Sequence, residues 1–112
     1  FVIFDLGAIY TIGSFHVWNY NENPPNLTGR GVNRVSVEYG TTPDLGSTVT
    51  GITNFAEADG TSTYPGESFE KFPPFKARYI KFDINSNHGS DNNFYGLSEV
   101  QFYGELVPEP DS

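Results

Sequence analysis

Short segments in which apolar and polar residues alternate recur along this chain of 112 residues, and they constrain its fold more than any other feature. The odd-numbered residues are apolar or aromatic in 35–39, and the even-numbered ones are in 80–84 and 100–102. Such alternation is the pattern of half-buried β-strands. No stretch keeps apolar residues at the i, i+3, i+4, i+7 spacing of an amphipathic helix for three turns. The chain is therefore predicted to be all-β.

Seven strands are predicted from this alternation and from the glycines and prolines between the segments. Twelve Gly and eight Pro are spread along the chain, which is typical of many short strands joined by tight turns. The first segment is apolar on both faces and is expected to be a central strand. We expect an antiparallel β-sandwich over residues 1–105 and a flexible tail over 106–112. The predicted strands are 1–6, 10–20, 33–39, 47–55, 66–72, 77–84 and 97–105.

The charge and the composition argue against several classes of function. The formal net charge is −8 at pH 7 and the six basic residues are scattered, whereas nucleic-acid binding needs clustered Lys and Arg. The chain has no Cys, so disulfides and thiolate chemistry are excluded. No apolar run approaches the roughly 20 residues that a membrane-spanning helix needs. The only histidines are His16 and His88, and no spacing pairs two carboxylates, so an enzyme is not expected.

Three long polar loops follow the second, fourth and sixth predicted strands, over about 20–32, 56–65 and 85–96. If successive strands run antiparallel, alternate loops fall at the same end of the sandwich. Long loops held by a rigid β-structure are where binding residues concentrate. We therefore expect one binding end, formed by these three loops.

The residues on these loops and their flanks suit carbohydrate. A sugar has apolar ring faces edged by hydroxyl groups, so its site needs an aromatic surface together with amides, carboxylates or guanidinium groups. The candidate ligand-binding residues are Trp18, Tyr20, Asn21, Arg30, Tyr64, His88, Asp91, Asn92, Asn93 and Tyr95.

Structural alternatives apply to several of these candidates. Trp18 lies within a predicted strand and could belong to the core. Asn19 and Asn21 could bond loop backbone, as asparagines in turns do. Arg30 could hold an oxygen of its own loop.

Two carboxylates are candidate metal ligands. Calcium takes oxygen ligands from carboxylates and loop carbonyls, and Asp91 and Glu99 could contribute to such a site. Glu99 alternates with Val100 and Phe102, so it is either an ordinary outer-face residue or an oxygen ligand beside the last loop.

Five segments appear in the order seen in a known family. They are Phe-Asp-Leu-Gly (4–7), Phe-His-Val-Trp-Asn-Tyr-Asn (15–21), Gly-Arg-Gly-Val (29–32), Ala-Arg-Tyr-Ile-Lys-Phe (77–82) and Gly-Leu-Ser-Glu-Val-Gln-Phe (96–102). The ordered set resembles discoidin-like domains, which are the coagulation-factor C-type and related carbohydrate-binding modules of the galactose-binding-like jelly-roll fold. The resemblance covers about residues 2–105.

This resemblance implies an eight-stranded sandwich with binding loops at one end and often a structural calcium ion. It implies binding of sugars, lipids or proteins without catalysis, and it assigns Glu99 as a calcium ligand. In the family a further segment, with the first strand and other calcium ligands, precedes the Phe-Asp-Leu-Gly motif. Here the sequence begins at that motif, so we expect the first strand to be lacking and a sheet edge to be open.

The last residues carry a second resemblance. Val-Pro-Glu-Pro at 107–110 is similar to the start of a PEP-CTERM sorting signal, which is found on exported bacterial proteins. It implies a location at the cell surface or in the extracellular matrix.

Two functional hypotheses follow. The first is a non-catalytic extracellular module that binds a glycan or polysaccharide through the three loops. The second is a structural subunit of a filament, surface layer or matrix, in which identical chains assemble through the open β-edge and aromatic contacts. Ten Phe and seven Tyr favour such contacts. A hydrolase is the third and weakest hypothesis.

Overall fold

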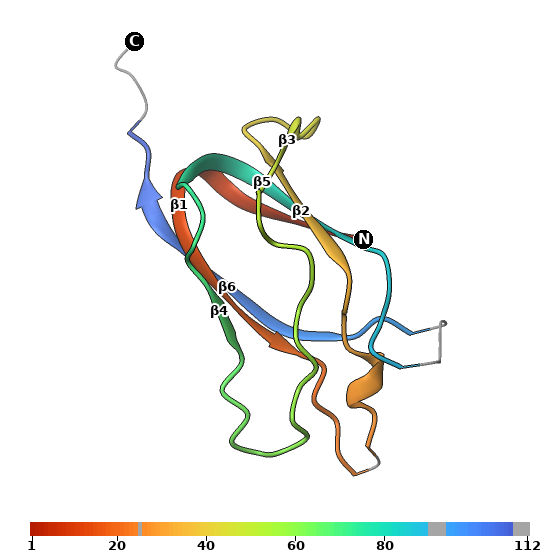
Figure 1. The fold of residues 1–112 in the computed structure, drawn as a ribbon. Helices are drawn as coiled ribbons and strands as arrows, with labels where there is room; N and C mark the ends of the chain where they lie inside the picture. The colour runs from red at the N-terminus through yellow and green to blue at the C-terminus, as the bar shows by residue number, and fades with distance from the viewer. Residues whose placement is uncertain (25, 90–93, 109–112) are drawn as a thin grey trace.

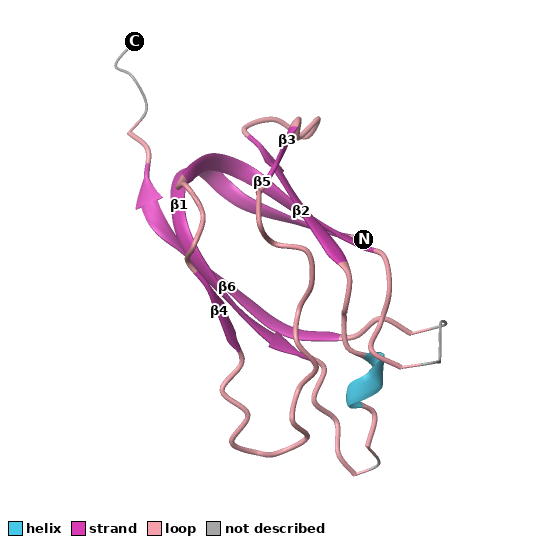
Figure 2. Cartoon of the chain, in the orientation of Figure 1, coloured by secondary structure: helices cyan, strands magenta, loops and turns pink. Residues whose placement is uncertain are grey.

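The computed structural model describes residues 1–24, 26–89 and 94–108, and within them the protein is all-β (Figures 1 and 2). Six strands form one antiparallel sheet, and a single 3-10 turn covers Thr28–Arg30. No helix in these ranges has the length and apolar character needed to cross a membrane. The strands are β1 (Val2–Asn19), β2 (Val35–Gly40), β3 (Ser47–Thr48), β4 (Glu67–Phe69), β5 (Phe75–Ile84) and β6 (Leu97–Leu106).

The sheet curls over because β1 takes part in both halves of the molecule. One edge of β1 pairs with β5 and then with β4, while its other edge pairs with β6 from Tyr10 to Asn19. Gly7 has a φ of 85°, and the register with β5 shifts between Asp5 and Tyr10. The strand bends in this region, as Figure 1 shows. The first half of β1, with β5, β2 and β3, then faces its second half, with β4 and β6.

Aromatic side chains fill the space between these two layers. Phe15, Phe55 and Phe82 are almost completely buried. The ring centroids of Phe15 and Phe82 are 6.0 Å apart, and those of Phe4 and Phe102 are 5.2 Å apart, so both pairs connect one layer to the other. Burial of apolar area contributes roughly 25 cal/mol per Å², which makes these large rings the main stabilising groups. The predicted antiparallel sandwich is confirmed.

Two strand predictions need correction. Segments 1–6 and 10–20 were expected to be separate strands divided at Gly7, but the extended backbone continues through this glycine and makes them one. Segment 47–55 was expected to be one continuous strand, yet Ser47–Thr48 alone forms a strand with β2, and Asn54 adds an isolated bridge to Arg34. In the remainder, every third residue is buried, which fits no strand, and Gly51 has a φ of 91°. The buried residues there are Val49, Ile52 and Phe55.

The first half of β1 is an edge rather than the expected central strand. Among the described residues, no strand pairs with the second edge of residues 2–6, because β6 follows β1 only as far back as Tyr10. Ile3 is 48% exposed on the outer face. From Ile9 onward this edge of β1 is covered: β6 runs to Leu106, and the Val107 N–H donates to the Ile9 carbonyl at 2.9 Å.

Phe82→Ala tests the packing between the layers. Phe82 contacts the rings of Phe4, Phe15 and Phe55, so its removal leaves a cavity and should lower the free energy of unfolding by about 3–5 kcal/mol. Urea unfolding followed by circular dichroism measures this change. Phe1→Ala is the control, since this ring is 79% exposed and its loss should change stability little. Equal effects of the two substitutions would contradict the assigned core.

Candidate functional site

The three long loops lie together at one end of the sandwich, in the lower part of Figure 1. The loop after β1 is bonded to both of the others. Asn21 Nδ2 donates to the Thr61 carbonyl at 2.8 Å, and Asn21 Oδ1 accepts from the Gly60 N–H at 2.7 Å. On the other side, the His88 N–H donates to the Gly31 carbonyl at 3.1 Å. The loops therefore share one end, as the count of antiparallel strands predicted.

A buried asparagine at the end of β1 fixes the base of this loop cluster. Asn19 is 1% exposed. Its Nδ2 donates to the carbonyls of Val32 and Ala56, both at 2.8 Å. Its Oδ1 accepts the N–H groups of Val32 and Tyr20, both at 2.9 Å. All the hydrogen-bonding capacity of the side chain is used to hold loop backbone, which agrees with the structural alternative for this residue.

Glycine at position 31 is required by this arrangement. A Cβ there would lie 2.6 Å from Asn19 Oδ1, which is closer than any tolerated contact. The Gly-Arg-Gly segment thus lets the first loop approach the asparagine, and it places Arg30 at the surface between two glycines.

A small hollow lies beside Arg30, with a volume of about 120 Å³. The Arg30 Cζ lies 4.2 Å from the centroid of the Phe94 ring, which is a cation–π contact. Tyr95 is 45% exposed. A Cβ at Gly96 would collide with Tyr20, so these two residues pack closely. We call this feature, lined by Tyr20, Arg30, Phe94, Tyr95 and Gly96, the loop-end hollow.

The phenol of Tyr20 is held as a neutral group. Its hydroxyl donates to Glu22 Oε2, and this hydrogen bond raises the pKa of Tyr20 above its usual value. The phenol therefore stays protonated at neutral pH and gives the hollow a polar edge next to Arg30.

Three other predicted ligand residues have polar atoms that bond other parts of the chain. Asn21 joins two loops, as described above. His88 Nε2 lies 2.6 Å from the Phe55 carbonyl oxygen. The Tyr64 hydroxyl accepts the Asn19 N–H at 3.2 Å, and burial raises the pKa of Tyr64. These contacts order the loops. Asp91, Asn92 and Asn93 lie outside the described residues.

Trp18 belongs neither to the core nor to the loop-end hollow. It is half-buried on the outer face of β1, between the buried residues Val17 and Asn19. Its ring centroid lies 4.2 Å from that of His16. The interpretation of Trp18 as a core residue is therefore wrong, because the strand period places this side chain on the opposite face from Val17.

The predicted calcium ligand Glu99 lies directly opposite Trp18 on β6 and is exposed. Within the part of the chain that the structure describes, no three His, Asp or Glu side chains come close enough together to hold a metal ion. Asp91, the expected partner of Glu99 in the calcium site, lies outside the described residues. Calcium binding thus stays a prediction.

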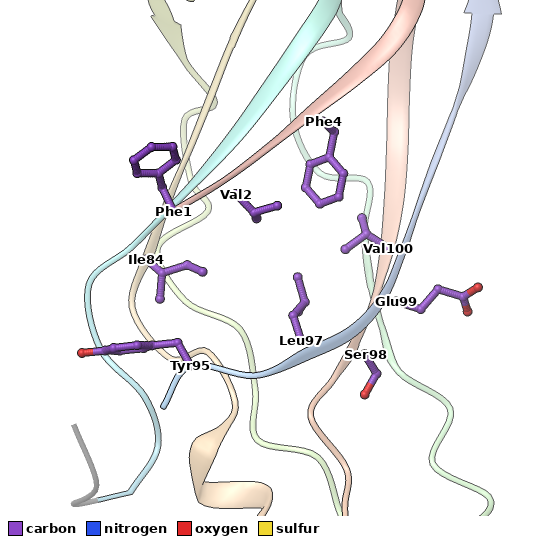
Figure 3. Close-up of a pocket in the computed structure, with 9 residues that line it drawn as sticks. All are labelled: Phe1, Val2, Phe4, Ile84, Tyr95, Leu97, Ser98, Glu99 and Val100. Atoms are coloured by element: carbon purple, nitrogen blue, oxygen red, sulfur yellow. The ribbon is translucent and has the colours of Figure 1, made fainter. Parts of the chain in front are cut away.

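A larger apolar groove, with a volume of about 620 Å³, opens between the first half of β1 and the start of β6. Figure 3 shows that the apolar side chains of both strands point toward one another there, whereas the Glu99 carboxylate points away. Sequence reasoning missed this groove, although the apolar character of both faces of residues 1–6 was a signal for it. The open groove is lined by Phe1, Val2, Phe4, Ile84, Tyr95, Leu97, Ser98, Glu99 and Val100.

One solved structure has a similar fold. It is the crystal structure of a fragment of a candidate chitobiase from Bacteroides thetaiotaomicron, with a TM-score of 0.68 and 23% sequence identity. The match covers 96% of this chain but 62% of that fragment, so the chain spans less than two thirds of it. At this level of identity the likeness shows a shared fold. No protein-family model and no curated protein sequence matches the chain.

Asn19→Ala tests the role of the buried amide. The substitution leaves the Val32 N–H and the carbonyls of Val32 and Ala56 without partners, and each unsatisfied buried group costs about 1–3 kcal/mol. We expect a loss of at least about 3 kcal/mol in the free energy of unfolding, measured in urea. Asn85→Ala is the matched control, since Asn85 is exposed and makes a single long contact of 3.4 Å. A loss below about 1 kcal/mol for Asn19→Ala would contradict this role.

Proposed function

We propose that the protein is a non-catalytic, carbohydrate-binding module whose site is the loop-end hollow. The observation that carries the proposal is the stack of Arg30 on Phe94, 4.2 Å from guanidinium carbon to ring centroid, beside the exposed ring of Tyr95. Apolar sugar faces pack on aromatic rings, while N–H and O–H donors bind the hydroxyl groups at the ring edge. Arg30 supplies N–H donors next to the rings, while the Tyr20 hydroxyl, which donates its proton to Glu22, offers a lone pair that accepts from a sugar hydroxyl group.

The ordered backbone of the loop end supports its interpretation as a binding site. The loop that carries Arg30 is fixed from one side by Asn21 and from the other by the Gly96 N–H, which donates to the Arg30 carbonyl at 2.7 Å. A site whose backbone is already ordered loses less conformational entropy when a ligand binds. The neighbour with a similar fold is described as a candidate chitobiase, which also directs the first tests to carbohydrate.

The contacts of the histidines support the absence of catalysis. His16 Nδ1 lies 2.6 Å from Ser68 Oγ, but its Nε2 faces the Pro65 carbonyl at 2.7 Å, where a catalytic triad has a carboxylate. His88 is bonded to a loop carbonyl. The proposal also includes an exported location at a bacterial surface or in an extracellular matrix, which rests on the resemblance of residues 107–110 to a sorting signal.

Arg30→Ala tests the proposed site. We expect it to weaken binding of a short oligosaccharide at least about ten-fold, because it removes both the hydrogen-bond donors and the group that orders Phe94. Isothermal titration with disaccharides of glucose, xylose, mannose and N-acetylglucosamine measures the affinity. Lys76→Ala is the charge-matched control, since Lys76 lies on β5 opposite Thr11 and outside the loop cluster. Binding that is unchanged in Arg30→Ala, or absent in the unmodified protein, would overturn the proposal.

A structural subunit is the second candidate function, and the open groove favours it. Residues 2–6 present an edge that no described strand covers, and Phe1 and Ile3 are exposed beside it. Unpaired edge strands with apolar side chains are templates for pairing with another chain.

Ile3→Lys tests assembly through this edge. If identical chains join there, the unmodified protein should form large species in light scattering, and a lysine on the exposed face should reduce them to monomers. Lys71→Glu, at an exposed site following β4, is the control for a general effect of charge. A monomer at all concentrations of the unmodified protein would exclude assembly through the edge.

A further inference from the structure

The outer face of β1 and β6 carries a row of aromatic and hydrogen-bonding side chains. In the strand register, Ser14 lies opposite Tyr103, His16 opposite Gln101, and Trp18 opposite Glu99. Directly opposed residues in an antiparallel pair share a face, so these side chains form one continuous strip. We call the six residues Ser14, His16, Trp18, Glu99, Gln101 and Tyr103 the sheet strip.

Four side chains of the strip are held in place by contacts with one another or with neighbouring parts of the chain. His16 is fixed through both ring nitrogens, to Ser68 Oγ at 2.6 Å and to the Pro65 carbonyl at 2.7 Å, and Trp18 packs on its ring. The Tyr103 hydroxyl donates to Gln101 Oε1 at 2.6 Å, although the Tyr103 side chain is 49% exposed. An ordered aromatic surface that remains open to solvent loses little entropy on binding a ligand.

The strip leads directly into the loop-end hollow. Tyr20 directly follows the end of β1, and it and Trp18 are the partly exposed neighbours on either side of the buried Asn19. Tyr20 packs against Gly96, where a Cβ would lie 2.5 Å from its ring, and both residues line the hollow. From Ser14 to Tyr20 the strip and hollow together extend about 20 Å, at the roughly 3.3 Å rise of a strand.

The size of the hollow shows why this continuity matters. Its volume of about 120 Å³ is well below the roughly 300 Å³ at which pockets begin to enclose a whole small ligand. A ligand seated there must extend over the neighbouring surface, and the sheet strip is the adjoining surface with aromatic faces and amide and carboxylate groups.

We propose that the strip and the hollow together bind a linear, neutral polysaccharide, with one sugar unit in the hollow and the following units along Trp18 and Tyr103. This inference rests on the proposed function. The rings of Trp18 and Tyr103 receive sugar faces, and the Gln101 amide and the Glu99 carboxylate bond their hydroxyl groups. The net charge of −8 and the position of Glu99 within the strip disfavour an acidic polymer.

Chain length is the measurement that tests this inference. We would titrate the protein with paired dimers and hexamers of β-1,4-linked glucose, xylose, mannose and N-acetylglucosamine. At least one hexamer should bind about ten-fold more tightly than its dimer, because only the hexamer reaches the strip. Trp18 is the only tryptophan, so its fluorescence should change with the hexamer and not with the dimer.

Variants separate the strip from the hollow. Trp18→Ala and Tyr103→Ala should each reduce hexamer affinity roughly ten-fold and leave dimer affinity unchanged, whereas Arg30→Ala should weaken both. Tyr103→Ala keeps the test valid if Trp18→Ala fails to fold, since Tyr103 is exposed at the surface. Tyr79→Ala is the matched control, because Tyr79 lies on β5, outside the sheet strip, and should affect neither ligand.

The outcomes distinguish the two proposals. Equal affinities for dimer and hexamer, with no effect of Tyr103→Ala, would overturn the extended site and leave the loop-end function standing. Failure of every dimer and hexamer to bind would overturn both.

Discussion

The hydrogen bonds of the Asn19 side chain are the contacts on which the loop end of this protein depends. They join the last residue of β1 to Val32 and Ala56, which belong to two different loops. Because the amide is buried, each bond is made in a medium where an unpaired backbone group is costly. This residue therefore fixes the positions of the loops relative to the sheet. The register of the sheet in turn determines which side chains of β1 and β6 lie opposite one another on the outer face.

The curl of β1 is the second constraint, and it has two consequences. It brings Phe15 against Phe82, so that one sheet can bury aromatic side chains between its own halves. It also means that β6 accompanies only the second half of β1, which leaves residues 2–6 with an unpaired edge among the described strands. The same bend that builds the core thus opens the apolar groove beside it.

The sequence predicted the elements that depend on local pattern. Residues 33–39, 77–84 and 97–105 become β2, β5 and β6 within two residues, because period-two alternation is a property of the strand itself. The prediction failed where pairing with a distant segment decides the outcome, as in residues 47–55, where the chain leaves the ladder after Thr48 and bridges again only at Asn54. The number and length of the strands depend on such pairing, so the alternation could not reveal them.

The location of the candidate site and three of its five lining residues, Tyr20, Arg30 and Tyr95, were predictable, but their contacts were not. Antiparallel alternation placed the three loops at one end, yet it could not indicate that Arg30 would stack on Phe94 or that His88 would be used for a loop carbonyl. Trp18 illustrates the reason. Its residue type suggested that it belongs to the core. Its neighbours Val17 and Asn19 are both buried, however, and because alternate residues of a strand face opposite sides, Trp18 faces outward.

The open groove and the sheet strip differ in chemistry, and that difference separates the partners that would suit them. Six of the nine residues that line the open groove have aliphatic or phenyl side chains, and its one carboxylate points away from it (Figure 3). Such a surface is stabilised most by the apolar side chains of another strand, because they exclude water while the backbone of that strand pairs with the open edge.

On the sheet strip, aromatic rings alternate with an amide and a carboxylate that remain open to solvent. A protein partner would have to desolvate those polar groups, whereas a polysaccharide brings hydroxyl groups that replace their water. The strip is thus the surface on which a carbohydrate has the advantage, and the groove is the one on which another strand has it.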